Sequence, residues 1–163
     1  MSSLGVTDLI RLGLSAGILG TLAMDALNVL FARAGLITRI DVGTIGRMAG
    51  GWMRGEFRYG HPDEMASIEG EWYVGLITHY AIGVGLAIPY VFGWGLLIGD
   101  TPSASWAVPY GLGTTVASWF FVYPCMGFGA LGLRSPDGWR APFSSLANHL
   151  FYGLGLAVGI LLL

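Results

Sequence analysis

Residues 72–98 read WYVGLITHYAIGVGLAIPYVFGWGLLI and contain no Asp, Glu, Lys or Arg. An α-helix of about 20 apolar residues crosses roughly 30 Å of bilayer hydrocarbon, so this run is long enough to span a membrane. Pro89 lies inside the run, where neighbouring helices can satisfy the carbonyl group that a proline leaves free. The stretch therefore predicts a kinked transmembrane helix.

Three more apolar runs of similar length surround this one. They occupy residues 12–32, 104–133 and 142–163. The first is interrupted only by Asp25 and Asn28 as strongly polar side chains, and turn-forming Gly, Pro, Ser and Asp residues separate the last three spans. The sequence predicts an all-α integral membrane protein, a four-helix transmembrane bundle that forms a single domain over residues 1–163, with the lipid bilayer as its main partner.

The composition agrees with a membrane environment and excludes some classes of function. The chain is 54% hydrophobic and 11% charged, which lies outside the usual range of soluble domains. With a net charge of −2 and no lysine it lacks the basic surface of a nucleic-acid-binding protein. Its single cysteine, Cys125, cannot form an internal disulfide, and the zinc-finger spacing of cysteines is missing. The many glycines favour close packing of membrane helices.

The arginines predict the orientation of the spans. Four crossings place all arginines but Arg11 on one side, and these are Arg33, Arg39, Arg47, Arg54, Arg58, Arg134 and Arg140. The positive-inside rule assigns that side to the cytoplasm. We therefore expect a multi-pass protein of the bacterial inner membrane with both termini outward.

The first connection, residues 34–70, is the only long segment outside the predicted spans. Asp41 has the side chain of a helix N-cap, and the following Ile45, Met48 and Trp52 recur on one helical face. The pattern predicts a short amphipathic helix over about 41–55 that lies on the membrane surface, in the first cytoplasmic connection. Several glycines in this segment weaken the prediction, because glycine lowers helix stability.

Three ionisable side chains fall inside the predicted spans: Asp25, His79 and His149. Such residues are rare and costly in a membrane, so each indicates a functional site. Each lies seven or eight residues, roughly 10 to 12 Å, from the predicted cytoplasmic end of its helix. Cys125 and Met126 fall at a similar depth in the third span. The sequence predicts one polar layer to which all four spans contribute.

Helical periodicity places these residues on polar or small-residue stripes that can face a common interior. The stripes are Gly17, Thr21, Asp25 and Asn28; Gly75, His79 and Gly83; Thr114, Ser118 and Cys125; and Ser145, His149 and Gly153.

The layer allows several chemistries. Imidazoles and a carboxylate are ligands for transition metals, and a thiol or thioether shifts the preference toward softer ions. A histidine can also bind haem axially, and an Asp/His chain can relay protons. Alternatively, the polar groups only fix the helices with hydrogen bonds worth about 0.6 to 2 kcal/mol each.

These readings lead to three hypotheses of function. The first is a site of Asp25, His79 and His149 that binds a transition metal or haem. The second is a proton-linked transporter of a small solute or ion, and the third is a non-catalytic subunit of a homo-oligomer or a larger membrane complex. Enzymatic activity stays uncertain, because no nucleophile, base and orienting group can be placed together from sequence.

Two residues outside the polar layer are secondary candidates for a functional site. Glu71 starts the second span, where it either caps the helix dipole or opens a cytoplasmic path to His79. His61 lies near Asp63 and Glu64, and it is either an ordinary loop histidine or part of a group that loads a cation.

Short motifs in a fixed order give the chain a resemblance. They are Met24-Asp25, Gly46-Arg47, Gly70-Glu71, His79-Tyr80-Ala-Ile-Gly83, Pro124-Cys-Met-Gly127-Phe-Gly129, and Ser145-Leu146-Ala-Asn-His149 with Gly153 and Gly155. Over nearly its whole length the chain resembles an uncharacterised bacterial family of small integral-membrane proteins, known as a domain of unknown function. The resemblance implies the fold and the choice of residues, and it implies no activity.

Overall fold

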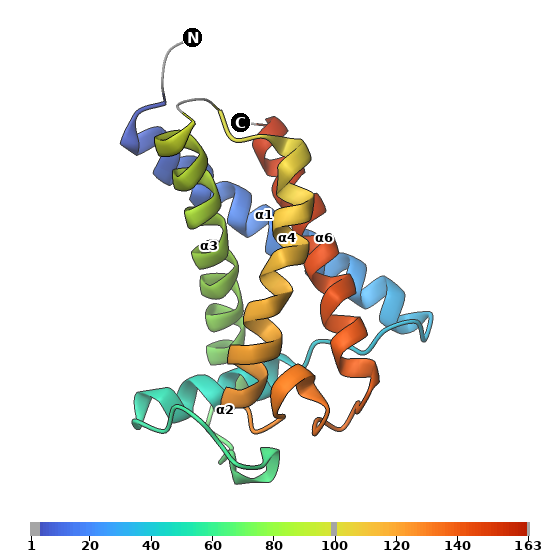
Figure 1. Cartoon of the computed structure of the whole chain (residues 1–163). Helices are drawn as coiled ribbons and strands as arrows, with labels where there is room; N and C mark the ends of the chain where they lie inside the picture. Colours follow the sequence, from blue (N-terminus) through green and yellow to red (C-terminus); the bar gives the residue numbers. More distant parts are fainter. Residues whose placement is uncertain (1–3, 99–100, 163) are drawn as a thin grey trace. The chain divides into compact units, whose positions relative to one another are not determined.

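Helices are the only regular secondary structure in the residues that the computed structural model of the protein describes, which are 4–98 and 101–162, and none of these residues forms a strand (Figure 1). Five helices contain 12 residues or more: α1 (Val6–Arg33), α2 (Val42–Met53), α3 (Glu71–Leu97), α4 (Ala104–Ala117) and α6 (Arg140–Leu162). The shorter elements are 3-10 turns at Pro62–Glu64 and Ala130–Gly132, a π-helix at Ser118–Val122, and α5 (Tyr123–Cys125). The all-α prediction is confirmed.

Three of these helices, α1, α3 and α6, are long and apolar enough to cross a membrane. The sequence predicted four such helices, and three of them are confirmed in length and hydropathy. The third predicted span, residues 104–133, is a helical run from Ala104 to Cys125 that is divided into α4, the π-helix and α5. Helix α3 continues through Pro89, as its sequence predicts.

The π-helix ends two residues before a proline, Pro124. The backbone N–H of Tyr123 donates to the carbonyl of Ser118, five residues earlier. Pro124 follows, and in a regular α-helix its ring would collide with the carbonyl of Phe120. A wider turn relieves this collision, which gives a physical reason for the change of helix type at this point.

The predicted extension of the third span to residue 133 is wrong, because a glycine ends the helical run. Gly127 has φ of +75°, a left-handed conformation that a helix cannot continue. Its N–H donates to Pro124 O, and the N–H of Phe128 donates to Tyr123 O. The rings of Tyr123 and Phe128 then pack with centroids 6.0 Å apart. These are the two hydrogen bonds and the apolar contact of a Schellman motif.

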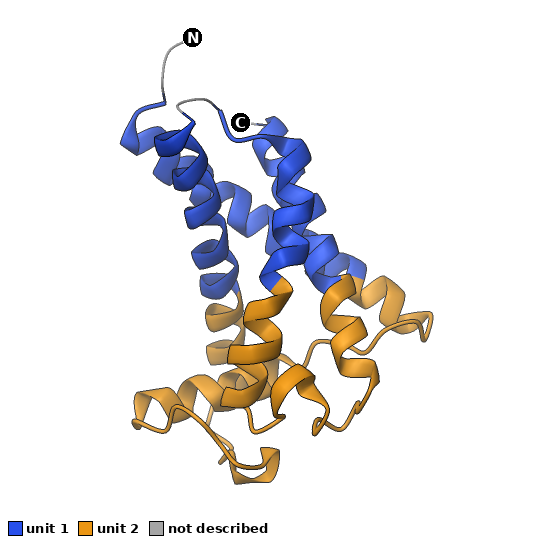
Figure 2. Cartoon of the chain, in the orientation of Figure 1, with its two compact units in different colours: residues 1–27, 80–114, 148–163 blue, residues 28–79, 115–147 orange. Residues whose placement is uncertain are grey.

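The chain forms two compact units, which Figure 2 distinguishes by colour. Unit 1 comprises residues 1–27, 80–114 and 148–163, and unit 2 comprises residues 28–79 and 115–147. All arginines except Arg11 belong to unit 2.

Unit 1 consists of segments of α1, α3, α4 and α6 that contact one another through small residues. A Cβ atom added to Gly17 of α1 would lie 2.7 Å from the Cα of Val84 in α3. One added to Gly111 of α4 would lie 2.4 Å from the Cα of Gly153 in α6. One added to Gly20 of α1 would lie 2.8 Å from the ring of Tyr152 in α6. The glycines thus permit backbone-to-backbone approach, as predicted.

Unit 2 contains the predicted amphipathic helix as α2. Asp41 caps it as expected, with its carboxylate accepting from the N–H groups of Gly43 and Thr44 at 3.0 and 3.3 Å. The predicted apolar face is also present, but protein covers it. Met48 is fully buried in a cluster with Tyr59, Met65, Cys125 and Met126, and Ile45 and Trp52 pack against that cluster. The apolar face of α2 therefore holds unit 2 together.

Candidate functional site

Asp25 is a partly buried residue of α1, and its carboxylate hydrogen-bonds with the phenol of Tyr80 on α3. Both residues belong to unit 1. A hydroxyl group can donate to a carboxylate and can equally accept from a protonated carboxyl group. The partner of Asp25 therefore suits both protonation states of the side chain.

His149 of α6 has a hydroxyl partner as well. Its Nδ1 lies 2.8 Å from Oγ1 of Thr114 on α4, also within unit 1. The Thr114 hydroxyl donates its single proton to the carbonyl of Gly111 at 2.6 Å, so toward His149 it acts as an acceptor. This geometry assigns a proton to Nδ1 of the His149 ring.

Other polar groups of unit 1 are bonded to backbone carbonyls. The phenol of Tyr152 donates to Gly83 O at 2.6 Å, and the hydroxyl of Thr21 donates to Gly17 O at 2.9 Å. Thr21 is fully buried, and its hydroxyl fills the space beside Gly83 that a side chain would need. These contacts fix the helices around the two ionisable pairs.

His79 is buried at 8% exposure on α3 and belongs to unit 2. Residues 4–98 and 101–162 contain no group of three or more His, Cys, Asp or Glu side chains placed to hold a metal ion. The predicted metal set of Asp25, His79 and His149 is therefore not confirmed as a three-ligand group, and a metal or haem at these residues stays a prediction.

Glu71 is the first residue of α3, as predicted, and its carboxylate is held by an arginine of α2. Nε and Nη2 of Arg47 each donate to one carboxylate oxygen at 2.8 Å. This hydrogen bonding holds the pKa of the Arg47 guanidinium above its ordinary value, so the pair stays charged. Residue Gly46 makes the contact possible, because a Cβ there would lie 1.9 Å from the carbonyl oxygen of Glu71.

The secondary candidates have structural positions in unit 2. Cys125 and Met126 are buried in the apolar cluster around Met48. Asn28 is 2% exposed and hydrogen-bonds to the backbone of the loop that follows α1. His61 is exposed at the start of the first 3-10 turn, with Nδ1 3.1 Å from a carboxylate oxygen of Asp63.

Sequence reasoning missed the partners rather than the candidates. Tyr80 is adjacent to a candidate histidine, but nothing in one sequence indicates that its phenol meets Asp25. Thr114 was placed on a polar stripe, yet its pairing with His149 depends on the approach of α4 to α6. For the ion pair between Arg47 and Glu71, the signal in the sequence was the opposite charge of the two side chains.

A family model described as "Protein of unknown function (DUF2938)" matches residues 14–163 of the chain. No curated protein and no solved structure matches the chain. The match covers nearly the whole chain, and the protein therefore belongs to this family of unknown function.

Proposed function

We propose that the protein crosses a membrane four times and that Asp25 and His149 bind and release protons in the passage of an ion or small solute. The observation that carries the proposal is the partner of each group. Both ionisable side chains of the unit-1 interior are held by neutral hydroxyls, Tyr80 and Thr114. Such bonds persist when the acid or imidazole changes its charge, as a proton relay requires.

The fourth crossing in this proposal is the run from Ala104 to Cys125. This run rises by 1.5 Å per residue in its α-helical part, and its length of about 20 residues is enough to span the hydrocarbon of the bilayer. Within unit 1 the α4 segment contacts both α3 and α6: Tyr110 donates to Leu86 O at 2.6 Å, and Gly111 approaches Gly153. These contacts support a transmembrane bundle of four helices.

The exposed surface and the charges support the proposed lipid contact and orientation. Helix α1 exposes Ile10, Ile18 and Leu22 at 46, 47 and 52%, as expected of a face against acyl chains. The arginines of unit 2 support a cytoplasmic position for residues 34–70 and 126–139, with both termini outward in a bacterial inner membrane.

Proton flux into liposomes containing the purified protein and an internal pH dye tests the proposal. A potassium gradient with valinomycin supplies the driving voltage, and each candidate co-solute is added in turn. We expect Asp25→Asn and His149→Gln to lose at least tenfold in flux, because neither variant can exchange the proton. Tyr80→Phe should reduce the flux as well.

Two variants serve as matched controls. Tyr110→Phe removes a phenol that bonds only a backbone carbonyl in the hydrogen bonds described above, and Thr21→Val removes a hydroxyl of the same kind. Both should keep the flux near that of the wild type. A flux that is equally low in these controls would assign Tyr80 and Thr114 to helix packing and overturn the proposal.

The transition-metal or haem hypothesis is tested on the same preparation. Stoichiometric metal, or a Soret band that disappears in His149→Gln and in His79→Gln, would replace the proton proposal with a ligand site. Protein without proton flux, metal or haem that purifies with a second membrane protein would instead support the hypothesis of an accessory subunit.

A further inference from the structure

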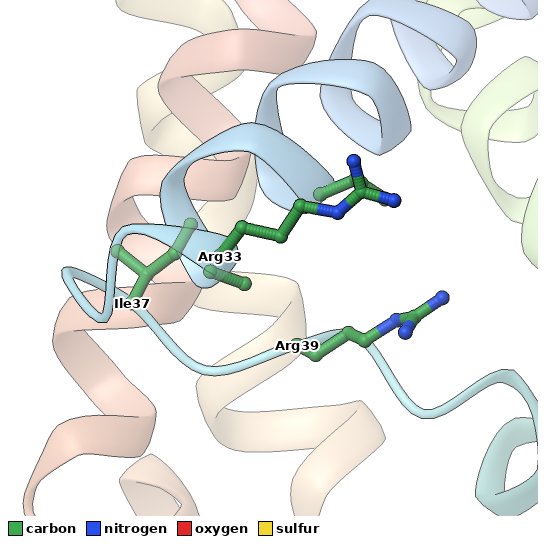
Figure 3. A pocket seen from close by; sticks show the side chains of 5 residues that line it. Arg33, Ile37 and Arg39 are labelled. Atoms are coloured by element: carbon green, nitrogen blue, oxygen red, sulfur yellow. The ribbon is translucent and has the colours of Figure 1, made fainter.

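A pocket of about 220 Å³ lies at the C-terminal end of α1, within unit 2. Its lining is Val29, Ala32, Arg33, Ile37 and Arg39. Figure 3 shows Arg33, from the helix, and Arg39, from the loop after it, extending their guanidinium groups in the same direction. The pocket therefore combines two cations with an apolar base.

Neither cation has a protein partner among residues 4–98 and 101–162. Arg33 and Arg39 make no ion pair or hydrogen bond with the part of the chain that the structure describes, whereas Arg47 and Arg54 pair with carboxylates and Arg140 bonds a carbonyl. Two guanidinium groups that line one pocket repel each other, and an anion between them turns this repulsion into attraction. The electrostatics of the pocket thus favour an anionic ligand.

The loop that carries Arg39 is fixed by a buried side chain. Asn28, the residue on α1 immediately before the pocket-lining Val29, donates to Thr38 O at 3.0 Å and accepts from the N–H of Ile40 at 3.1 Å. These two bonds flank Arg39 and hold its backbone against the helix.

Further contacts hold the same loop at other points. The N–H of Thr38 donates to Oγ of Ser144 at 2.9 Å, and Arg140 donates to Gly35 O at 2.9 Å. Gly35, with φ of +73°, ends α1 with a Schellman turn. Because the loop is ordered before any ligand arrives, binding loses little conformational entropy.

The chemistry of the lining identifies the class of ligand. Arginine forks match the oxygens of a phosphate group and bind them with paired hydrogen bonds. The volume is below the roughly 300 Å³ at which pockets for drug-sized ligands begin, so a small group fits better than a nucleotide. The apolar residues suit the carbon atoms attached to a phosphate ester.

We propose that this pocket binds a phosphate ester, and that its natural source is the headgroup of an anionic phospholipid. In the topology proposed above, this end of α1 meets the cytoplasmic leaflet, whose anionic lipids attract basic groups. The site uses neither Asp25 nor His149, so it stands apart from the proton proposal.

Native mass spectrometry of the full chain in detergent tests the proposal with phosphatidylglycerol as the probe. Arg33→Gln and Arg39→Gln should each weaken phosphatidylglycerol binding by about fivefold, the factor that corresponds to about 1 kcal/mol for one basic residue at an anionic lipid surface. Phosphatidylcholine, whose headgroup carries no net charge, should bind more weakly to the wild type and should be less affected by these variants.

Arg58→Gln is the matched control, because it removes the same charge from an exposed position of unit 2 outside the pocket. Thermal melts of all three variants verify folding. Equal phosphatidylglycerol affinity in the three variants would overturn the site.

A second arm distinguishes a lipid from a soluble ligand. Glycerol phosphate and inorganic phosphate are titrated against the same variants by thermal shift. Arginine-dependent binding of phosphatidylglycerol alone assigns the pocket to lipid. Arginine-dependent binding of glycerol phosphate at a similar affinity keeps the phosphate site but overturns its assignment to lipid. The proton-flux assay is independent of either result.

Discussion

The carboxylate of Glu71 receives two hydrogen bonds from one guanidinium, and this geometry explains the residue better than a path for ions does. Arg47 and Glu71 are separated by 24 positions and lie on different helices. Their opposite charges are visible in the sequence, but the contact depends on how closely α2 approaches α3 at Gly46. One sequence without a helix packing angle cannot supply that information.

A double-mutant cycle measures this pair. We expect Arg47→Gln and Glu71→Gln to show a coupling free energy of about 0.5 to 1 kcal/mol in thermal unfolding, because solvent screens a pair whose arginine side chain is 38% exposed. The coupling should shrink in high salt. Arg54→Gln with Glu56→Gln, a more exposed pair with one contact of 3.3 Å, should couple less. Additive changes in the Arg47 cycle would contradict a stabilising pair.

Asn28 gives a second prediction at this scale. Replacing this buried amide by alanine removes two hydrogen bonds to the loop after α1 and should lower the free energy of unfolding by about 1 to 3 kcal/mol. Thermal melts in detergent measure the loss. Ser15→Ala, whose hydroxyl bonds only to carbonyls of its own helix in the contacts observed, should change stability by much less. Similar melting temperatures for the two variants would contradict the role of Asn28.

Helix ends show how far the sequence can predict the elements. Gly35, Gly55 and Gly127 each follow a helix in a left-handed conformation, with the two hydrogen bonds of a Schellman motif. The sequence predicts the end of the first span at residue 32 because the apolar run stops before Arg33, and α1 ends at Arg33. The third span was extended past Gly127 because apolar residues continue to Leu133, and hydropathy does not detect a glycine stop.

The two costs of a side chain at such a stop can be separated. Gly127→Ala should destabilise the protein by more than 2 kcal/mol, because left-handed strain of about 1 to 2 kcal/mol adds to a Cβ placed 2.5 Å from the backbone of His61. Gly55→Ala has a similar φ of +84° and open space around it, so it should cost the strain alone. Equal losses in denaturant or thermal melts would show that the contact with His61 contributes nothing.

Glycines inside helices give a related prediction. Gly46→Ala should lower the free energy of unfolding by about 1 to 3 kcal/mol or prevent folding, because its Cβ would overlap the carbonyl of Glu71. Gly85→Ala on α3 meets nothing within 4 Å and should stabilise the protein slightly, since alanine favours helix. A stable Gly46→Ala variant would contradict the close packing of α2 against α3.

At the scale of the whole chain, composition and hydropathy predicted the helical class and four membrane-spanning helices, of which α1, α3 and α6 have the length and hydropathy to cross a membrane. The candidate residues Asp25 and His149 were predicted from the cost of charge in lipid, and the structure supplies their hydroxyl partners. What the sequence could not supply was the change of helix type within Ser118–Val122, since it depends on a backbone collision at one proline.

The number of crossings is open to direct test. In a Cys125→Ala background, cysteines at exposed Ser67, Thr101 and Asp137 are labelled from each side of the membrane with an impermeant maleimide. Four crossings place Ser67 and Asp137 on the cytoplasmic side and Thr101 outside. If the run from Ala104 to Cys125 does not cross, Asp137 will react from the same side as Thr101.

The π-helix before Pro124 has a further consequence for comparing members of the family. A wide turn accommodates one more residue than a regular α-helical turn does, so a homologue with one residue fewer in 118–122 would lack the bulge yet keep both flanking helical segments. The side chain aligned with Cys125 would then keep its direction around the helix axis, because the wide turn absorbs the extra residue; the same residue added to a regular α-helix would rotate that side chain by about 100°. A one-residue gap in alignments at this segment should therefore be read as the loss of the bulge, with the facing directions on its two sides preserved.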